Sequence, residues 1–521
     1  MNSTRRSTSG KVDDVLVVGG GDVGLLTALG IRKQLPEVEV QVVDDFETDV
    51  PRVGKSTYLD IQNVLHRELG IKERRFIEEV RPVWKASVFF RDWGGNDPFH
   101  YPFDVSNAFK APDWRNSAEH FAYYYERLYN SSDHQTRCEQ LVSQRKTPWY
   151  YQNDGNLKKY PNCADHLSSR RFNNFLRTLC RERGVSLVDD EITHVDTSGT
   201  HIDAVHSNGA SYGADLFVDA TGFNRVLRSE QNVSFREFGF PLDAAFNVRI
   251  DRDLDDVIPA TVVETGDHGW FWNIDTYDNR DLGYVFASEY VDHDSALEEF
   301  REFTRDVSPA AADEDPIGGP DDVDTYQFSS GYYERGWVDN CLAIGNAGGF
   351  VEPLQSTALT ANASLAMEFA NLMSAHGRIA DDDIREAYNR AVQRSWESIY
   401  DFIAVHYRYT TGDTELWKRM ASIEYGDRLD RIATEFDRYG YNWTVERTNE
   451  NGLSDLRYFD VTDFFRIMRP MGATSEFYES NSFQTSDELV EEIDQFYREA
   501  EQQVDKQHLT ISQFYENVLD Y

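Results

Sequence analysis

The stretch Asp14-Val15-Leu16-Val17-Val18-Gly19-Gly20-Gly21-Asp22-Val23-Gly24 decides the fold of this chain. Its first five residues form a mostly apolar run of strand length, and residues 25–35 after it have a helical pattern. In a turn of the form G-x-G-x-x-G, Gly19 permits the tight turn, Gly21 lets a pyrophosphate approach the backbone, and Gly24 lets the helix pack on the strand. The stretch therefore predicts a strand, a glycine turn and a helix that together bind a dinucleotide.

A second apolar run strengthens this prediction. Residues 38–43 read as the next strand, and it ends at Asp44, 20 residues after Gly24. This is the spacing expected for the carboxylate that accepts a hydrogen bond from a ribose hydroxyl group. The cofactor-binding residues predicted in this part of the chain are Gly19, Gly21, Asp22, Val23, Gly24 and Asp44.

Two later segments indicate flavin adenine dinucleotide (FAD) rather than a nicotinamide cofactor. Residues 214–222 and 342–347 each read as a buried strand followed by a glycine turn, and they resemble the second and third signatures of glutathione-reductase-like flavoproteins. That resemblance places Gly345 and Asn346 near the ribityl chain. It also aims the helix predicted from Leu359 to about residue 373 at the isoalloxazine, with its positive N-terminal end foremost. The expected fold class is α/β, of the FAD-binding Rossmann type, with a substrate-binding mixed β-sheet part and a helical C-terminal region.

The length and composition suit one large folded body. The 521 residues are 40% hydrophobic and 13% aromatic, with no internal repeat, so there is enough apolar material for a sizeable core. We expect a disordered segment at 1–11 and a FAD-binding module at 12–425, with substrate-domain insertions at about 86–165 and 230–335. A mainly helical region at 426–521 is expected to pack on that module.

The charge excludes some partners. The chain has 91 acidic and 52 basic residues, a formal net charge of −39, which disfavours nucleic acid as a partner. Because the acidic excess runs along the whole chain, it indicates a halophilic, haloarchaeal-like surface suited to high salt. No apolar run reaches about 18 residues, and the first residues are polar, so we expect a cytoplasmic protein without membrane contact. Four scattered cysteines predict neither a zinc site nor a disulfide framework, and no metal site is expected.

Two strings point to one group of flavoproteins. Residues 51–57, P-R-V-G-K-S-T, resemble a segment of the flavin-dependent halogenases that usually reads P-x-x-G-V-G-E-[AS]-T. Here Lys55 replaces the usual Glu, and the match adds Gly54 and Lys55 to the expected FAD contacts. Residues 84–93, W-K-A-S-V-F-F-R-D-W, match the segment that carries the catalytic lysine of that family. Lys85 is therefore the leading catalytic candidate, against the alternative of a strand-end lysine that reaches out to solvent.

Two further strings support the same family, of the tryptophan-halogenase type. Residues 268–275, H-G-W-F-W-N-I-D, resemble W-x-W-x-I-P with Asp275 in place of Pro, and put Trp270 and Trp272 on one strand face beside a channel. Residues 348–358 resemble G-F-x-[ED]-P-L-x-S-T-G, whose backbone amides hold a halide at a helix N-terminus. The halide-binding residues implied are Ser356, Thr357 and Ala358, where Ala358 replaces Gly. Gln355 replaces a Glu and stays a catalytic candidate.

The resemblance implies an FADH2-dependent halogenase. A separate flavin reductase would supply the reduced flavin, and O2 would convert chloride or bromide into hypohalous acid. The acid would pass Trp270 and Trp272 to Lys85, which directs it to an electron-rich small aromatic molecule such as an indole, phenol or pyrrole. We expect a monomer or homodimer.

Two alternatives stay open at this stage. Other flavin oxidoreductases, such as monooxygenases or prenyl reductases, share the fold and the FAD signatures. A non-catalytic flavin-binding protein is conceivable because of the departures from the family pattern at Lys55, Asp275, Gln355 and Ala358.

Overall fold

The computed structural model describes residues 10–47, 54–104, 122–123, 125, 135–307, 317, 322–440, 457–480 and 486–519. The chain forms two compact units, each assembled from three separate segments. The first unit takes its described residues from 1–81, 168–239 and 328–397, and the second from 82–167, 240–327 and 398–521. Residues 51–53, the start of the string at 51–57, lie outside the described residues.

A six-stranded sheet organises the first unit. Its strands are ordered β10-β2-β1-β14-β23-β22, and all neighbours are parallel except β22 and β23. Val15 to Val18 of β1 are at most 3% exposed, because a central parallel strand is covered on both faces. The strands are β1 (Asp14–Val18), β2 (Glu39–Asp44), β10 (Ser186–Asp189), β14 (Leu216–Asp219), β22 (Trp337–Val338) and β23 (Cys341–Ala343).

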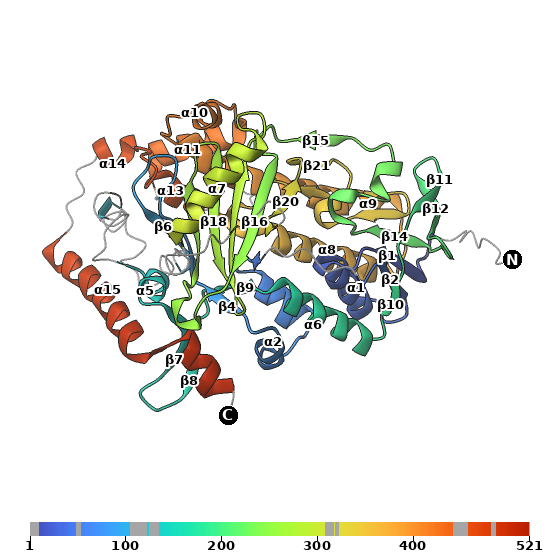
Figure 1. Ribbon diagram of the computed structural model, residues 1–521, viewed down its shortest axis with the longest axis horizontal. Helices are drawn as coiled ribbons and strands as arrows, with labels where there is room; N and C mark the ends of the chain where they lie inside the picture. Colours follow the sequence, from blue (N-terminus) through green and yellow to red (C-terminus); the bar gives the residue numbers. More distant parts are fainter. Residues whose placement is uncertain are drawn as a thin grey trace. The chain divides into compact units, whose positions relative to one another are not determined.

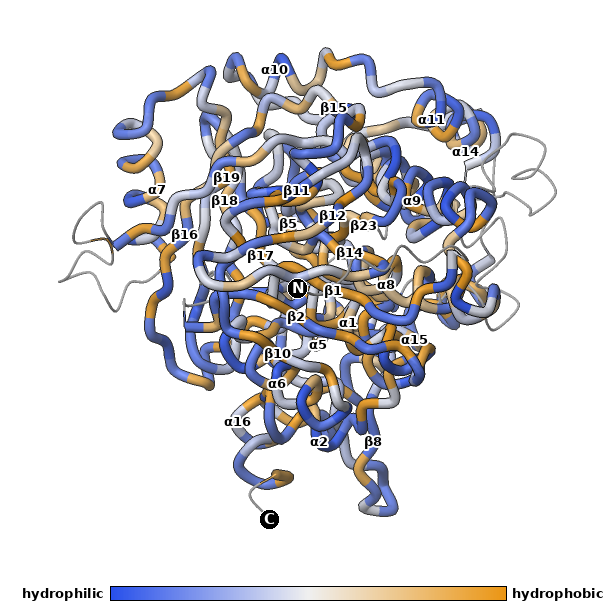
Figure 2. The backbone as a smooth tube through the Cα atoms, turned by 90° about the vertical axis from the view of Figure 1, so that its right-hand side faces the viewer, coloured by the Kyte–Doolittle hydropathy of each residue, from blue (hydrophilic) through white to orange (hydrophobic). Residues whose placement is uncertain are grey.

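Helices and short ribbons complete this unit. The first helix, α1, packs against both α6 and α8, and Figure 1 shows these helices beside the strands. Hydrophobic residues run along α1 and α8 in Figure 2, as expected for helices that cover a sheet. The helices are α1 (Asp22–Gln34), α2 (Glu73–Val80), α6 (Ser169–Glu182), α8 (Thr357–Ala375) and the first part of α9 (Asp382–Arg408), with short helices η1 (Asn63–Glu68), η4 (Gly222–Asn224), η5 (Arg228–Glu230), η9 (Gly345–Ala347) and η10 (Leu354–Ser356). The short strands are β3 (Lys55–Ser56), β11 (His194–Ser198), β12 (His201–His206), β13 (Ser211–Tyr212), β15 (Phe235–Glu237), β21 (Gly331–Tyr333) and β24 (Gly349–Phe350).

A mixed seven-stranded sheet organises the second unit. Its order is β20-β16-β19-β18-β17-β5-β6, antiparallel throughout except for the parallel pair β17 and β5. The helix α7 (His293–Val307) lies across one face, where Phe246, Phe271 and Phe300 belong to a buried cluster (Figure 1). The strands are β5 (Ser87–Phe90), β6 (Phe99–Pro102), β16 (Ala244–Ile250), β17 (Ala260–Thr265), β18 (Gly269–Asp275), β19 (Arg280–Phe286) and β20 (Asp324–Gln327).

The rest of the second unit is a pair of ribbons and a set of helices. The strand β4 (Val83–Lys85) pairs antiparallel with β9 (Ala164–Leu167), and β7 (Lys146–Tyr151) lies between β8 (Leu157–Lys159) and β25 (His508–Thr510). The helices are α5 (Arg137–Ser143), α10 (Glu415–Ala421), α11 (Asp427–Tyr439), α13 (Val461–Met468), α14 (Glu476–Ser480), α15 (Asp487–Gln507) and α16 (Ile511–Phe514), with the last part of α9 and the short η6 (Leu254–Asp256) and η11 (Tyr515–Leu519).

The predicted elements compare well with the observed ones, with one difference. The predicted strand, glycine turn and helix are β1, residues 19–21 and α1. The string at 84–93, which the sequence analysis treats as one segment, contributes to two strands, because the chain changes partners at Ala86. There β4 pairs with β9, whereas β5 joins the seven-stranded sheet beside β17. Among the described residues, no helix combines the length and hydropathy needed to cross a membrane.

Candidate active site

The glycine turn after β1 leaves an open helix N-terminus. Gly19 has φ +108°, and a Cβ atom there would overlap the backbone of Ala220, so this position requires glycine. A Cβ atom at Gly24 would overlap the carbonyl oxygen of Gly19. At Gly21, which caps α1, a Cβ atom would meet none of the described residues within 4 Å. No described residue fills the space beside Gly21, and the first amides of α1, which have no acceptor within the helix, suit a pyrophosphate.

Asp44 lies beside this turn, at the end of β2. A Cβ atom on Gly20 would be 2.9 Å from Asp44 Oδ2. Burial raises the pKa of Asp44, and a hydrogen bond from the Gly20 amide opposes that rise. The fold thus brings the carboxylate to the glycine turn, as the spacing along the sequence predicts.

Two polar residues of α6 also lie beside the glycine turn and Asp44, and the sequence did not predict them. Asn173 Nδ2 donates to the Gly20 carbonyl oxygen at 3.2 Å and to Asp22 Oδ1 at 3.0 Å. The guanidinium carbon of Arg177 lies 4.8 Å from the centre of the Phe46 ring, and the charge of Arg177 acts on Asp44. Because α6 follows the turn by about 150 residues, no local spacing signals these contacts.

Lys55, the residue that replaces the family's Glu, pairs with the start of α1. Its Nζ lies 3.2 Å from Asp22 Oδ2, and the Asp22 side chain is 4% exposed. Gly54 beside it is buried. The substitution therefore places a cation at the open end of α1, where an anionic group is expected.

The second glycine turn meets the first. Gly345 has φ +69°, and a Cβ atom on it would be 3.4 Å from Val23 Cγ1 of α1. Its amide donates to Asn362 Oδ1 of α8 at 2.9 Å. Asn346 follows in η9 and is partly exposed. The structure thus brings Gly345 of the second glycine turn against Val23 at the start of α1.

The segment before α8 has a strained backbone. Gln355 and Ser356 have φ 64° and 59°, two successive non-glycine residues in the left-handed region. Such residues cost on the order of 1–3 kcal/mol each and cluster at functional sites. The turn lets α8 begin at Thr357, so the first-turn amides of Thr357, Ala358 and Leu359 have no acceptor within the helix.

The geometry also refines the expected halide contacts. The Ser356 amide donates to the Pro353 carbonyl oxygen at 3.1 Å, which leaves the amides of Thr357 and Ala358 as the better donors. Ala358 lies inside α8 and has no positive φ, so the replacement of the family's Gly causes no backbone strain.

Lys85 is fully buried in the second unit. Its side chain has no solvent exposure, so it does not reach out to solvent as a strand-end lysine would. Burial lowers its pKa to about 7, and its Nζ lies 5.3 Å from the centre of the Phe103 ring. A lysine with this pKa is available both as ammonium and as amine near neutral pH.

Trp270 and Trp272 share one face of β18, as predicted. Their ring centres are 6.0 Å apart, and Trp93 lies 6.2 Å from Trp270. The indole of Trp272 covers Gly283 of β19, where any side chain would overlap it. Its Nε1 has no hydrogen-bond partner among the described residues. The two indoles lie opposite the face that packs on α7.

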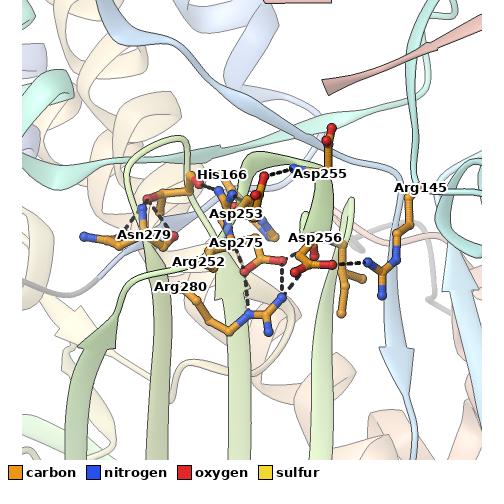
Figure 3. A network of polar contacts seen from close by, with 11 residues as sticks. Arg145, His166, Arg252, Asp253, Asp255, Asp256, Asp275, Asn279 and Arg280 are labelled. Carbon is orange, nitrogen blue, oxygen red and sulfur yellow. Dashed lines mark hydrogen bonds and ion pairs between the residues drawn. The ribbon is translucent and has the colours of Figure 1, made fainter. Parts of the chain in front are cut away.

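Asp275, which stands where the family usually has Pro, forms a buried network of ion pairs and hydrogen bonds. Its carboxylate accepts from Arg280 Nε at 2.8 Å, Arg280 Nη2 at 3.0 Å and the Ile258 amide at 2.7 Å. Arg252 Nε lies 3.3 Å from Oδ1 (Figure 3). The hairpin that follows is closed by a hydrogen bond from the Thr276 amide to Asn279. The departure from Pro therefore has its own structural support.

The predicted site residues fall into two groups. The FAD and halide candidates and Gln355 lie in the first unit, and Lys85, Trp270 and Trp272 lie in the second. All four cysteines are buried, and none of them forms a disulfide.

The fold and the glycine turn define a FAD-binding flavoprotein of the Rossmann type. The family model for tryptophan halogenases matches residues 14–486, and the chain belongs to that family. It is 28% identical over 437 residues to the tryptophan 6-halogenase of Streptomyces toxytricini, covering 78% of this chain and 80% of that protein. It is 26% identical over 455 residues to the tryptophan 7-halogenase of Lentzea aerocolonigenes, covering 81% of each.

A solved structure shows the same fold. The flavin-dependent halogenase of Brevundimonas sp. BAL3 superposes with a TM-score of 0.77 at 22% identity, over 97% of this chain and 99% of that one. The predicted fold class is confirmed, and the chain is an enzyme of the flavin-dependent halogenase class.

Proposed function

We propose that this chain uses FADH2, O2 and chloride or bromide to halogenate an electron-rich small aromatic molecule of the indole, phenol or pyrrole kind. The observation that carries the proposal is the buried Lys85, whose pKa of about 7 suits the transfer of an electrophilic halogen. That the two curated relatives are tryptophan halogenases supports an aromatic substrate.

The first unit fits FAD. The open N-terminus of α1 would hold the pyrophosphate, with Gly21 leaving room, and Asp44 would accept from the ribose. When bound, reduced FAD would supply two of the four electrons that reduce O2, and the halide would supply the other two as it is oxidised to hypohalous acid. The chain has one glycine-rich dinucleotide turn of this kind, so we expect a separate flavin reductase to supply FADH2.

The strained turn at Gln355 and Ser356 presents amides to an anion. Thr357 and Ala358 would donate to the halide, because they open α8 and its dipole favours negative charge. Gln355 is buried at the position of the family's Glu, and we propose that it serves there as a neutral positioning group.

Lys85 would then control the oxidant. As ammonium it donates a hydrogen bond to hypohalous acid, and as amine it can carry the halogen. The adjacent rings of Trp270 and Trp272 would form an apolar stretch of the channel that leads the oxidant to Lys85 and leaves it intact for the substrate. Holding the oxidant at one point explains how a single ring carbon is selected.

The experiment combines the purified chain, FAD, NADH, a flavin reductase from another source and bromide with a panel of indoles, phenols and pyrroles. A product with the bromine isotope doublet, absent without bromide or without reductase, supports the proposal. A product that gains only oxygen would assign a monooxygenase instead. Unchanged substrates under all conditions would favour a non-catalytic flavin-binding protein.

We also infer that the protein is a monomer or homodimer. Its surface is proposed to be adapted to high salt. The net charge of −39 should loosen the fold at low ionic strength, because screening then fails to reduce the repulsion. The melting temperature is expected to rise between about 0.1 and about 3 M salt, where the Debye length falls from about 10 Å to below about 3 Å. A melting temperature that does not change would contradict this.

A further inference from the structure

His166 on β9 is buried, and both of its ring nitrogens have a partner. Nδ1 lies 3.0 Å from the Asp275 carbonyl oxygen, and Nε2 lies 2.9 Å from Thr261 Oγ1. A carbonyl oxygen only accepts, so Nδ1 carries the hydrogen and Nε2 accepts from the Thr261 hydroxyl. Burial, the charge of Lys85 and the charge of Arg252 lower the pKa of His166 to about 3, against the opposing bond to Asp275. The ring is therefore neutral and held in one tautomer.

The imidazole joins the ribbon that carries Lys85 to the seven-stranded sheet. In that ribbon, Val83 pairs with His166 and Lys85 pairs with Ala164. The partners of His166, in contrast, lie on β17 and at the end of β18. The ring thus fixes the ribbon relative to two strands of the sheet. His166 lies two residues along β9 from Ala164, the residue that pairs with Lys85.

The acceptor for His166 is itself immobilised. Asp275 is held by the fork of Arg280, by Arg252 and by the Ile258 amide, and its side chain is completely buried (Figure 3). Arg252 also donates to the Thr276 carbonyl oxygen. At this position the family usually has Pro, which cannot supply a carboxylate. The ionic network is therefore this chain's own means of fixing the end of β18.

We propose that His166 is a positioning residue for Lys85, anchored by the backbone of Asp275, with the Asp275–Arg280–Arg252 network supporting that anchor. The inference rests on the proposed function, since it presumes that Lys85 transfers the halogen. A displacement of about 1 Å at a reacting group costs up to about 100-fold in rate. The ribbon stays joined to the sheet where β4 continues through Ala86 into β5, so loss of the His166 contacts would let Lys85 shift rather than detach it. Such a shift would weaken halogen transfer without touching the flavin or halide sites.

Three variants separate the contacts of His166. His166→Asn keeps an amide N–H near the place of Nδ1, facing Asp275. His166→Gln instead places its amide near Nε2, facing Thr261, and His166→Leu removes both polar contacts. Each is assayed with FAD, reductase and bromide for product per flavin oxidised, site of bromination, kcat, KM and melting temperature.

We expect His166→Leu to lower kcat for product at least about tenfold, with more product brominated at other ring positions. KM for the aromatic substrate should stay within about twofold, because His166 acts through Lys85. His166→Asn should recover kcat to within about threefold of wild type, whereas His166→Gln should resemble His166→Leu. If the Leu variant fails to fold, the comparison of Asn with Gln still decides.

Three results would overturn the inference. One is a His166→Leu protein that melts lower but gives wild-type yield and regiochemistry below its melting temperature, as for a purely structural residue. The second is rescue by Gln and not by Asn, which would remove Asp275 as the anchor. The third is equal kcat in the Asn and Gln variants. A wild-type chain without any halogenated product would instead defeat the proposed function, before any variant is compared.

Discussion

The two units prepare their candidate sites by different physical means. In the first unit the ligand groups are backbone amides at the starts of α1 and α8, presented by Gly19, Gly21 and the left-handed pair Gln355 and Ser356. In the second unit the groups are buried side chains, namely Lys85 and the ionic network of Asp275. The first unit therefore depends on backbone conformation and open space. The candidate site of the second unit depends on the chemical identity of charged side chains whose burial is unfavourable because they lose their contacts with water.

The largest effect is expected at Lys85. Lys85→Ala should reduce halogenated product to about 1% or less, because the oxidant is no longer held, while halide-dependent flavin oxidation continues in the first unit. Lys85→Arg should fail too, since a guanidinium with a pKa above about 12 cannot become the neutral amine. Product and flavin oxidation are measured together, with Lys158→Ala, an exposed lysine of the same unit, as control. Near-normal regioselective yield in Lys85→Ala would remove Lys85 as halogen carrier.

The ionic network should give the next largest effect, on stability. Asp275→Ala leaves Arg280 and Arg252 as buried cations, so the free energy of unfolding should fall by about 3–5 kcal/mol. Denaturant titration measures this. The matched control is Arg145→Ala, whose ion pair with Asp256 is 50% and 64% exposed and should contribute less than about 1 kcal/mol. Equal losses in the two variants would show that burial does not distinguish the pairs.

The backbone-built site is tested at Gly21. Gly21→Val should weaken FAD binding at least about tenfold, or about 1.4 kcal/mol, because the side chain occupies the space for the pyrophosphate. The melting temperature without FAD should hardly change, since a Cβ atom there meets no atom of the described part of the chain within 4 Å. Gly209→Val, where a Cβ atom is equally free, is the control. Unchanged FAD affinity, measured by fluorescence titration, would contradict the assignment.

The last effect is of a different kind, the pH dependence of stability at Lys85. Burial lowers the folded-state pKa from the ordinary 10.5 to about 7. Between these values the unfolded chain binds the proton and the folded chain does not, so this group makes stability rise with pH across that window. Below pH 7 both states hold the proton, and the full cost of burying the charge remains. Lys85→Met has no titrating group at this position, so it should melt higher than the wild type at pH 7. This difference in melting temperature should become smaller between pH 7 and 10. A constant gap would mean that Lys85 stays charged throughout.

The sequence alone identified the nucleotide-binding part of the first unit because its signals are local. An apolar run, three glycines at fixed spacing and a helical pattern specify β1, the turn and α1, and the spacing also located Asp44. The helix α8 was found through resemblance, with an expected start at Leu359 where the structure has Thr357. The string around Lys85 was found through resemblance, since nothing local distinguishes a buried lysine from one that reaches solvent.

Only the tertiary structure decided the environment of those residues. The pKa of Lys85 depends on complete burial, and the roles of His166 and Asp275 depend on Thr261, Arg252 and Arg280, up to 109 residues apart in the chain. Residue type and spacing determine which backbone shapes are accessible. Desolvation and ion pairing depend instead on which distant side chains the fold brings together, and no local pattern encodes that.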